Sequence, residues 1–151
     1  MKIYNLLFFM VVLLFMGCED TKVSTHDFSE QQILAKNLDG SWGNASNIRT
    51  GNGVPIGILE NLLITFTVDT EGNPDSFLAE GANKVFTDQL GTWQWFDRDT
   101  LTKIVLSGER PVTVINIDLD NNKLTISFDV DTPGGGRQMG IGSYTVTLTR
   151  L

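Results

Sequence analysis

The segment from Gly91 to Val130 constrains the fold of this chain more than any other part of the sequence. It contains four runs in which apolar and polar residues tend to alternate, joined by short polar turns. Side chains switch faces of a β-strand at every residue, so this period is typical of strands. In residues 123–131 the apolar residues share one face: Leu124, Ile126, Phe128 and Val130. The segment therefore predicts a continuous antiparallel sheet with one buried face.

Further strand patterns flank this segment. Residues 62–68 and 143–151 alternate strongly, residues 76–80 favour a short strand, and Gly40-Ser41-Trp42 opens the first strand. Residues 44–57 are rich in Asn and Gly and predict a weak strand followed by a long loop. In total eight strands are expected, mostly with short links. Such meanders close as up-and-down barrels or stack as two sheets, so an all-β, eight-stranded antiparallel barrel is predicted, with a β-sandwich as the alternative.

One short helix is expected before the strands. Ser29 and Gln32 have the spacing of a capping box, and Gly40 can end a helix. The residues between them favour helix, so the prediction is a helix over about 30–38. Ile33, Leu34 and Leu38 are the candidates for its buried face.

The N-terminus has the pattern of an export signal. Lys2 precedes an uninterrupted apolar run, Leu6 to Met16, which is too short to cross a bilayer as a mature helix, and Gly17-Cys18 follows. Leu14 to Cys18 resembles the lipobox of bacterial lipoproteins, although Phe15 stands where an aliphatic residue is preferred. The resemblance implies cleavage before Cys18 and acylation of Cys18, with palmitate among the expected chains. The alternative is an ordinary signal peptide with an incidental cysteine.

This resemblance divides the chain into a signal peptide (1–17), a flexible tether (18–28) and one domain (29–151). It implies a lipid anchor in the cell outer membrane, with the domain on the periplasmic or the surface side. Glu19 and Asp20 resemble the signal that sends some lipoproteins of Gram-negative bacteria to the cell surface. Several buried acyl chains hold a protein on a membrane durably, whereas one holds it only marginally.

Composition argues against several chemistries. The formal net charge of −7 disfavours nucleic acid as a partner. One cysteine cannot form an intrachain disulfide or a multi-cysteine zinc site. The acidic residues of the turn 69–75 lack the spacing of a dedicated calcium loop, so a solvated turn is expected and no metal or cofactor is predicted. The lone histidine, His26, lies in the tether, and no nucleophile–base pattern occurs, so the domain is expected to be non-catalytic.

At the first strand, Gly40-Ser41-Trp42 looks like the G-x-W element of lipocalins, and Arg150 could stand in for the arginine that packs over that tryptophan. The segments GTWQWF and SYTVTLTR are similar to small lipocalin-like lipoproteins of Gram-negative bacteria. The resemblance implies a lipocalin-like barrel. The polar first strand and the lack of disulfides depart from typical lipocalins.

Two functions are compatible with these features. In the first, the barrel holds a small apolar or amphipathic ligand in a cup lined by five aromatic residues: Phe66, Trp93, Trp95, Phe128 and Tyr144. In the second, the interior is filled, the tryptophans are core residues, and the protein is an interaction subunit of an outer-membrane protein assembly that uses loops 44–57 and 132–142. Asp99-Thr100-Leu101 also resembles a bacterial O-glycosylation signal at Thr100.

Overall fold

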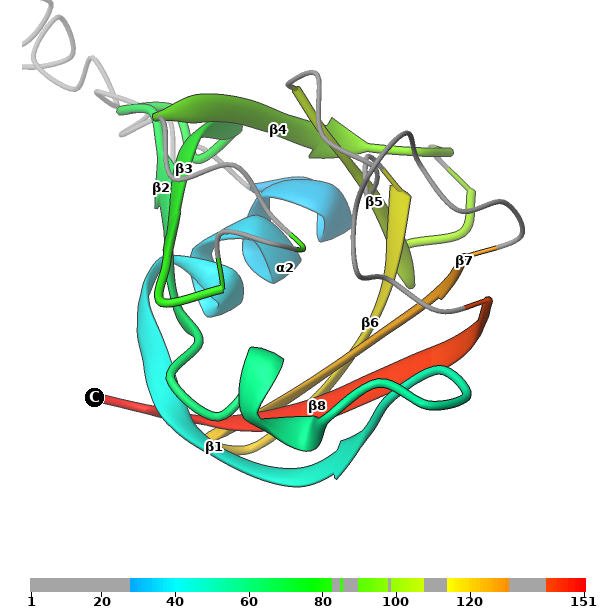
Figure 1. Ribbon diagram of the computed structural model, residues 1–151. Helices are drawn as coiled ribbons and strands as arrows, with labels where there is room; N and C mark the ends of the chain where they lie inside the picture. The colour runs from blue at the N-terminus through cyan, green and yellow to red at the C-terminus, as the bar shows by residue number, and fades with distance from the viewer. Residues whose placement is uncertain (1–27, 83–84, 86–89, 98, 108–113, 131–140) are drawn as a thin grey trace, which may run out of the picture.

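The protein is described by a computed structural model that places residues 28–82, 85, 90–97, 99–107, 114–130 and 141–151. Its strands form a closed barrel in which each strand is antiparallel to its neighbours (Figure 1). Among these residues the elements are α2 (Glu30–Leu38), β1 (Gly40–Arg49), the 3-10 helix η2 (Ile56–Ile58), β2 (Leu63–Val68), β3 (Pro74–Glu80), β4 (Gly91–Trp95), β5 (Lys103–Leu106), β6 (Val114–Asp120), β7 (Lys123–Val130) and β8 (Gly142–Arg150). The predicted eight-stranded up-and-down barrel with one short helix before it is confirmed.

The barrel closes because the first strand pairs with the last. Trp42 of β1 is opposite Arg150 of β8, and Gly43 is opposite Thr149. On its other edge β8 pairs with β7 along its whole length, including Ile126 opposite Val146. Every strand therefore has two hydrogen-bonded neighbours, and the β-sandwich considered as the alternative is excluded.

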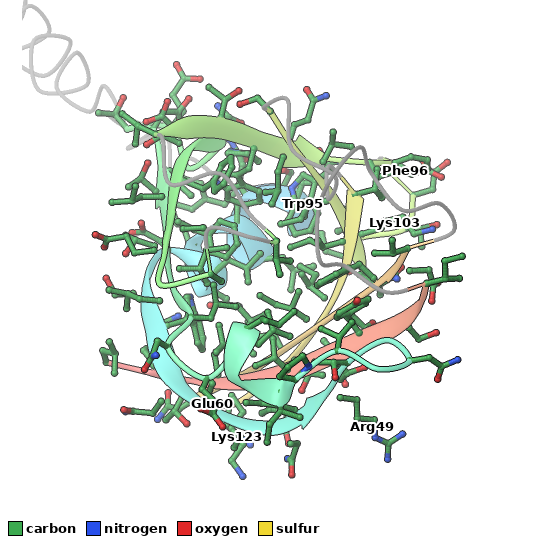
Figure 2. All side chains as sticks on the ribbon, in the orientation of Figure 1. Arg49, Glu60, Trp95, Phe96, Lys103 and Lys123 are labelled. Carbon is green, nitrogen blue, oxygen red and sulfur yellow. The ribbon has the colours of Figure 1, made fainter. Side chains whose placement is uncertain are left out.

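The alternation in β7 has the predicted outcome. Leu124 and Ile126 are fully buried and Phe128 nearly so, whereas Lys123 and Asp129 are exposed. The turn before β7 contains Asn121 with a φ of 54°, in the left-handed region that Asn tolerates and tight hairpins require. Figure 2 shows the charged ends of Arg49 and Lys123 pointing away from the barrel.

The barrel interior is filled by large side chains. The largest of those that are fully buried are Trp42, Tyr144, Phe66, Phe77, Leu38, Leu59, Leu62, Ile64, Ile104, Ile115 and Leu124. Burying one such aliphatic side chain stabilises a fold by about 1.5–3 kcal/mol relative to leaving it exposed. An eight-stranded barrel has an interior just wide enough for such packing. Packing of these buried side chains therefore stabilises the barrel.

The first strand is longer than its sequence suggested. Residues 44–49 were expected to belong to a weak strand or loop, but β1 continues to Arg49 with two shifts of register against β8. Asn44 and Asn47, at these shifts, have φ values of 52° and 48°. They form bulges, in which an extra residue in the left-handed region re-aims the strand. The asparagines that resemble loop residues are the residues that let β1 bend.

Helix α2 spans the predicted residues. Ser29 caps it: the Gln32 amide donates to the Ser29 side chain and the Ser29 amide donates to Gln32 Oε1. The prediction that Ile33 is buried was wrong, because Ile33 is 50% exposed while Ala35 and Leu38 are buried. Two residues correspond to about 200° around a helix, so Ile33 and Ala35 lie on nearly opposite faces.

Two ends of the barrel have different covers. At one end α2 lies close to the β2–β3 turn, where Gln32 Nε2 donates to the carbonyl of Glu71 at 2.9 Å. The other end carries η2 and the buried Leu59 and Leu62, between β1 and β2. We call these the helix end and the η2 end. The connections β4–β5 and β6–β7 and the C-terminus also lie at the helix end (Figure 1).

Candidate functional site

Four of the five aromatic residues predicted to line a ligand cup lie in the packed core. Phe66 and Tyr144 are fully buried, and Trp93 and Phe128 are each 2% exposed. Phe128 and Tyr144 stack with their ring centroids 5.1 Å apart, and Phe66 meets Trp93 edge-on at 5.3 Å. A ligand cannot reach these four without displacing core side chains. Trp95, the fifth, lies at the edge of the core and is only partly buried.

The three tryptophans differ in the hydrogen bond of the indole nitrogen. Trp42 Nε1 donates to the carbonyl of Leu38 at 2.8 Å, and Trp93 Nε1 donates to the carbonyl of Thr67 at 2.9 Å. Trp95 Nε1 is buried and has no hydrogen-bond partner among the described residues. Buried polar groups are almost always paired, so Trp95 is an exception that calls for a physical reason.

Arg150 lies over Trp42, the arrangement that the lipocalin resemblance implied. The guanidinium carbon is 4.4 Å from the centroid of the Trp42 ring. The same side chain donates from Nη1 to the carbonyl of Asp39 at 2.8 Å and from Nη2 to the carbonyl of Asn37. Arg150 therefore joins the end of β8 to the last turn of α2, and its role is to close the helix end.

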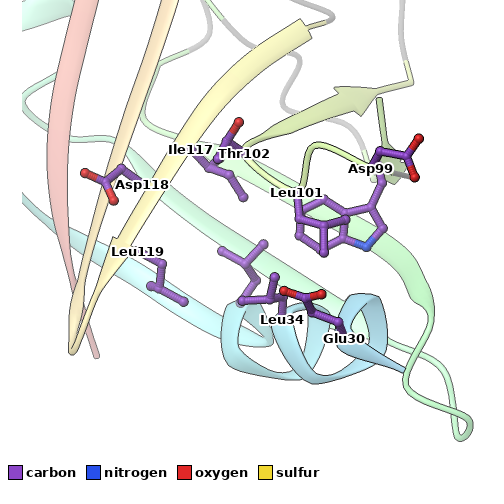
Figure 3. Close-up of a pocket in the computed structure, with 10 residues that line it drawn as sticks. Glu30, Leu34, Asp99, Leu101, Thr102, Ile117, Asp118 and Leu119 are labelled. Carbon is purple, nitrogen blue, oxygen red and sulfur yellow. The ribbon is translucent and has the colours of Figure 1, made fainter. Parts of the chain in front are cut away.

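A cavity of about 560 Å³ lies between α2, the β4–β5 turn and β6 at this end. Figure 3 shows Glu30 and Leu34 pointing from α2 towards Leu101, with Asp99 and Thr102 above and Leu119 to one side. The apolar residues that line it are Leu34, Leu38, Trp95, Leu101, Ile117 and Leu119. The polar residues that line it are Glu30, Asp99, Thr102 and Asp118. This volume is within the range of sites for drug-sized molecules.

The charges at the mouth of this cavity have one sign. Glu30, Asp99 and Asp118 are all exposed, and they come from α2, the β4–β5 turn and β6. Among the described residues that line the cavity there is no lysine or arginine, and none of the three carboxylates forms an ion pair within the described part of the chain. Within the described residues, the cavity therefore has an apolar floor and a rim of three negatively charged side chains.

A second cavity, of about 600 Å³, lies along the other side of α2. It shares Leu34 and Leu119 with the first, so the two adjoin at these residues. Its remaining lining is polar: Lys36, Asn37, Asn121, Asn122 and Arg150. Arg150 in its wall is already bonded to the carbonyls of Asn37 and Asp39, and fewer apolar side chains line this cavity than the first.

The sequence indicated only part of this site. Trp95 was a predicted site residue and Leu34 a predicted buried one, but the roles of Glu30, Asp99 and Ile117 were missed. These residues are far apart in the sequence, and the helix end brings them together. One sequence signal points to this site: Trp95 and Leu119 are apolar residues at the ends of predicted strands. In the structure such end positions are only partly buried, so their side chains can line a cavity.

The residues of the turn 69–75 serve the backbone. Asp69 Oδ1 accepts hydrogen bonds from the amides of Glu71 and Asn73, at 2.9 and 2.8 Å. The hydrogen bond from the Asn73 side chain to Asp69 Oδ2, helped by these two backbone bonds, lowers the pKa of the Asp69 carboxyl below its ordinary value. Across the described ranges no group of three or more His, Cys, Asp or Glu side chains is arranged to hold a metal ion.

Several sequence predictions fall on residues outside the described ones. They include the signal peptide, Cys18, the pair Glu19 and Asp20, and His26. Thr100 is described and exposed in the β4–β5 turn. None of the helices in the described ranges is both long enough and apolar enough to span a membrane. No protein-family model, no curated protein and no solved structure matches the chain.

Proposed function

We propose that the chain is a lipid-anchored lipoprotein of the bacterial outer membrane whose barrel binds a small amphipathic ligand and catalyses no reaction. Ligand binding is proposed from the cavity at the helix end, which has an apolar floor, a carboxylate rim and Trp95 in its wall. Sites for small molecules are concave, mostly apolar and equipped with a few polar groups. Because the barrel interior is filled by buried side chains, we place the ligand site in the cavity at the helix end.

The anchor is proposed from the lipobox-like residues 14–18. Residues 19–28 would then connect Cys18 to α2, and an extended chain of that length spans at most roughly 35 Å. The tether joins the barrel at the helix end, which also carries the cavity. A ligand that partitions into the membrane surface would thus be concentrated beside its site.

Metabolic labelling tests the anchor. With radiolabelled palmitate, the wild-type chain is expected to be labelled and to sediment with outer membranes. Cys18→Ser removes the only sulfur that can be acylated by lipoprotein processing, so that variant should be unlabelled. A wild-type chain without label, in a cell that labels its other lipoproteins, would refute the anchor.

Two neighbouring substitutions on α2 test the cavity. Leu34→Trp adds a large ring to the cavity wall, whereas Ile33→Trp adds the same ring at an exposed position outside it. Binding of single-chain amphiphiles, measured by isothermal titration calorimetry, should be lost with Leu34→Trp and retained with Ile33→Trp. Equal binding by both variants would show that the cavity is not the site.

One observation favours the second function, an interaction subunit. Four exposed apolar side chains lie at the η2 end, in its connections or at the first residue of β6: Ile56, Leu90, Val114 and Ile141. Ile56 and Ile141 are each 53% exposed, and the Asn52 amide donates to the Ile141 carbonyl at 3.3 Å. If this end holds a membrane protein, Ile56→Ser with Ile141→Ser should abolish crosslinks to it in intact cells. Unchanged crosslinks would remove this candidate.

A further inference from the structure

The chemistry of the cavity at the helix end restricts the kind of ligand. We infer that its ligand is a cationic amphiphile: a single apolar chain or ring that carries an ammonium group. This inference rests on the proposed function, because it names the ligand class of the same site. It is argued from the floor, the rim and the position of Trp95.

The floor selects an apolar body. Leu38 is 1% exposed and Ile117 7%, and both present carbon to the cavity from the core side. Leu34, Leu101 and Leu119 complete the apolar surface and are only partly buried. Covering this surface with a ligand removes it from water, which is favourable in proportion to the area covered.

The rim selects the charge. Glu30 points into the cavity from α2, whereas Asp99 in the β4–β5 turn and Asp118 on β6 stand beside it with their carboxylates turned away (Figure 3). Like charges gathered at a low-dielectric cleft focus the field and raise the local concentration of the opposite ion. A ligand carboxylate would lie near three carboxylates and, among the described residues that line the cavity, no lysine or arginine, so an anionic amphiphile is disfavoured.

Trp95 is compatible with the same occupant. Its indole lines the cavity, and aromatic rings attract ammonium groups through the ring quadrupole. Its buried Nε1 lacks an acceptor in the described part of the chain. The side chain is therefore not locked by a hydrogen bond, as Trp42 and Trp93 are, and it can adjust to a ligand without breaking one.

The test compares three probes with the same tail: octylammonium, octanoate and 1-octanol. The processed, lipidated protein is kept in uncharged detergent micelles, and binding is measured by calorimetry. Leu34→Trp, which fills the cavity, measures the background of probe entering the micelle. Above that background, octylammonium should bind roughly tenfold more tightly than octanoate and several-fold more tightly than octanol, the size expected for a few exposed charge pairs.

Charge variants locate the preference. In Glu30→Gln with Asp99→Asn, octylammonium should bind no better than octanol. The matched control is Glu60→Gln with Glu80→Gln, which makes the same change of net charge at the η2 end and should retain the preference. Should the cavity variant fold poorly, added salt gives a second measure, because 0.3 M NaCl should weaken only octylammonium binding to the wild type.

The outcomes separate this inference from the proposed function. Equal binding of the three probes above background, or tighter binding of octanoate, overturns the cationic ligand and leaves ligand binding in place. A preference that is lost equally in both pairs of variants also overturns it, since the net charge of the molecule would then be the cause. Binding no greater than in Leu34→Trp overturns both.

Discussion

At the scale of single residues, the three tryptophans allow a matched experiment. Trp42→Phe and Trp93→Phe each remove a hydrogen bond to a carbonyl, whereas Trp95→Phe removes a donor that has no partner in the described structure. The first two should therefore lower the free energy of unfolding by about 1–3 kcal/mol more than the third. Urea unfolding followed by circular dichroism measures all three variants.

The smaller ring of phenylalanine should also destabilise the protein less at position 95 than at 42 or 93, because Trp95 is the least buried of the three tryptophans. Trp95→Phe should thus be nearly neutral. If it destabilised the protein as much as Trp93→Phe, the Trp95 indole would have a partner in solution, and the free adjustment of this side chain in our inference would be wrong.

The contacts of Arg150 at the helix end depend on the planar shape of its guanidinium. It bonds two carbonyls near the end of α2 and lies over Trp42, which a lysine ammonium cannot do together. Arg150→Lys should lower the free energy of unfolding by about 1–3 kcal/mol. Arg49→Lys is the control, since Arg49 is exposed at the end of β1 and should tolerate the change. Equal effects in thermal unfolding would contradict the role of Arg150 at the helix end.

At the scale of elements, two glycines with the same backbone conformation have different surroundings. Gly53 and Gly81 both have a φ of 74°. A Cβ at Gly81 would lie 2.0 Å from the carbonyl oxygen of Asn61, whereas at Gly53 nothing lies within 4 Å. Gly53→Ala should cost about 1–2 kcal/mol for its left-handed backbone. Gly81→Ala should cost roughly 1–3 kcal/mol more, because the two connections must move apart. Equal unfolding midpoints in urea would refute this close approach.

The stability that the β2–β3 turn contributes through Asp69 should depend on pH. The folded pKa of Asp69 is lowered by its hydrogen bonds to Asn73, Glu71 and Gly72, so its contribution is present above the unfolded pKa. It is lost as the pH falls through the folded value, which lies below the ordinary pKa of an aspartate. Asp69→Asn should therefore be less stable than the wild type at pH 7, and the difference should shrink on acidification. Urea unfolding between pH 7 and 2 measures it, and a constant difference would refute this origin.

The elements that the sequence predicted well are those with local signals. The capping box of α2 and the alternation of β7 are encoded within a few residues, so their positions follow from the sequence. The bend in β1 is not local, because Asn44 and Asn47 resemble loop residues until β8 supplies a partner. The face of α2 was also missed at Ile33, since only the barrel end decides which side of that helix is covered.

At the scale of the whole molecule, closure is what creates the candidate site. Strand period predicts which residues face inward, and it predicted Trp93 and Phe128 correctly as inward-facing. It cannot predict which inward residues lie at an open end, because that depends on how far each strand extends and on what covers the barrel. Trp95 and Ile117 therefore line a cavity, while Trp93, two residues before Trp95, belongs to the core.

Closure also predicts how the molecule fails. In an open sheet, removal of a terminal edge strand leaves the other strands paired, but β8 is bonded to both β1 and β7. Deleting residues 142–151 exposes two unpaired edges and removes Tyr144, Val146 and Leu148 from the core, each of them fully buried. The truncated chain should therefore lose cooperative urea unfolding and associate, as measured by light scattering.

A synthetic peptide of residues 142–151 provides the complementary measurement. Both edges of the gap match the same ten residues, so the peptide should restore protected amides in β1 and in β7 together, as seen by hydrogen exchange. Protection of β7 alone would mean that the β1–β8 seam does not form in solution. A truncated chain that still unfolded cooperatively near the wild-type midpoint would mean that the other seven strands are stable as an open sheet. In the first case Arg150 would not hold α2, and the cavity that α2 lines would lose a fixed wall.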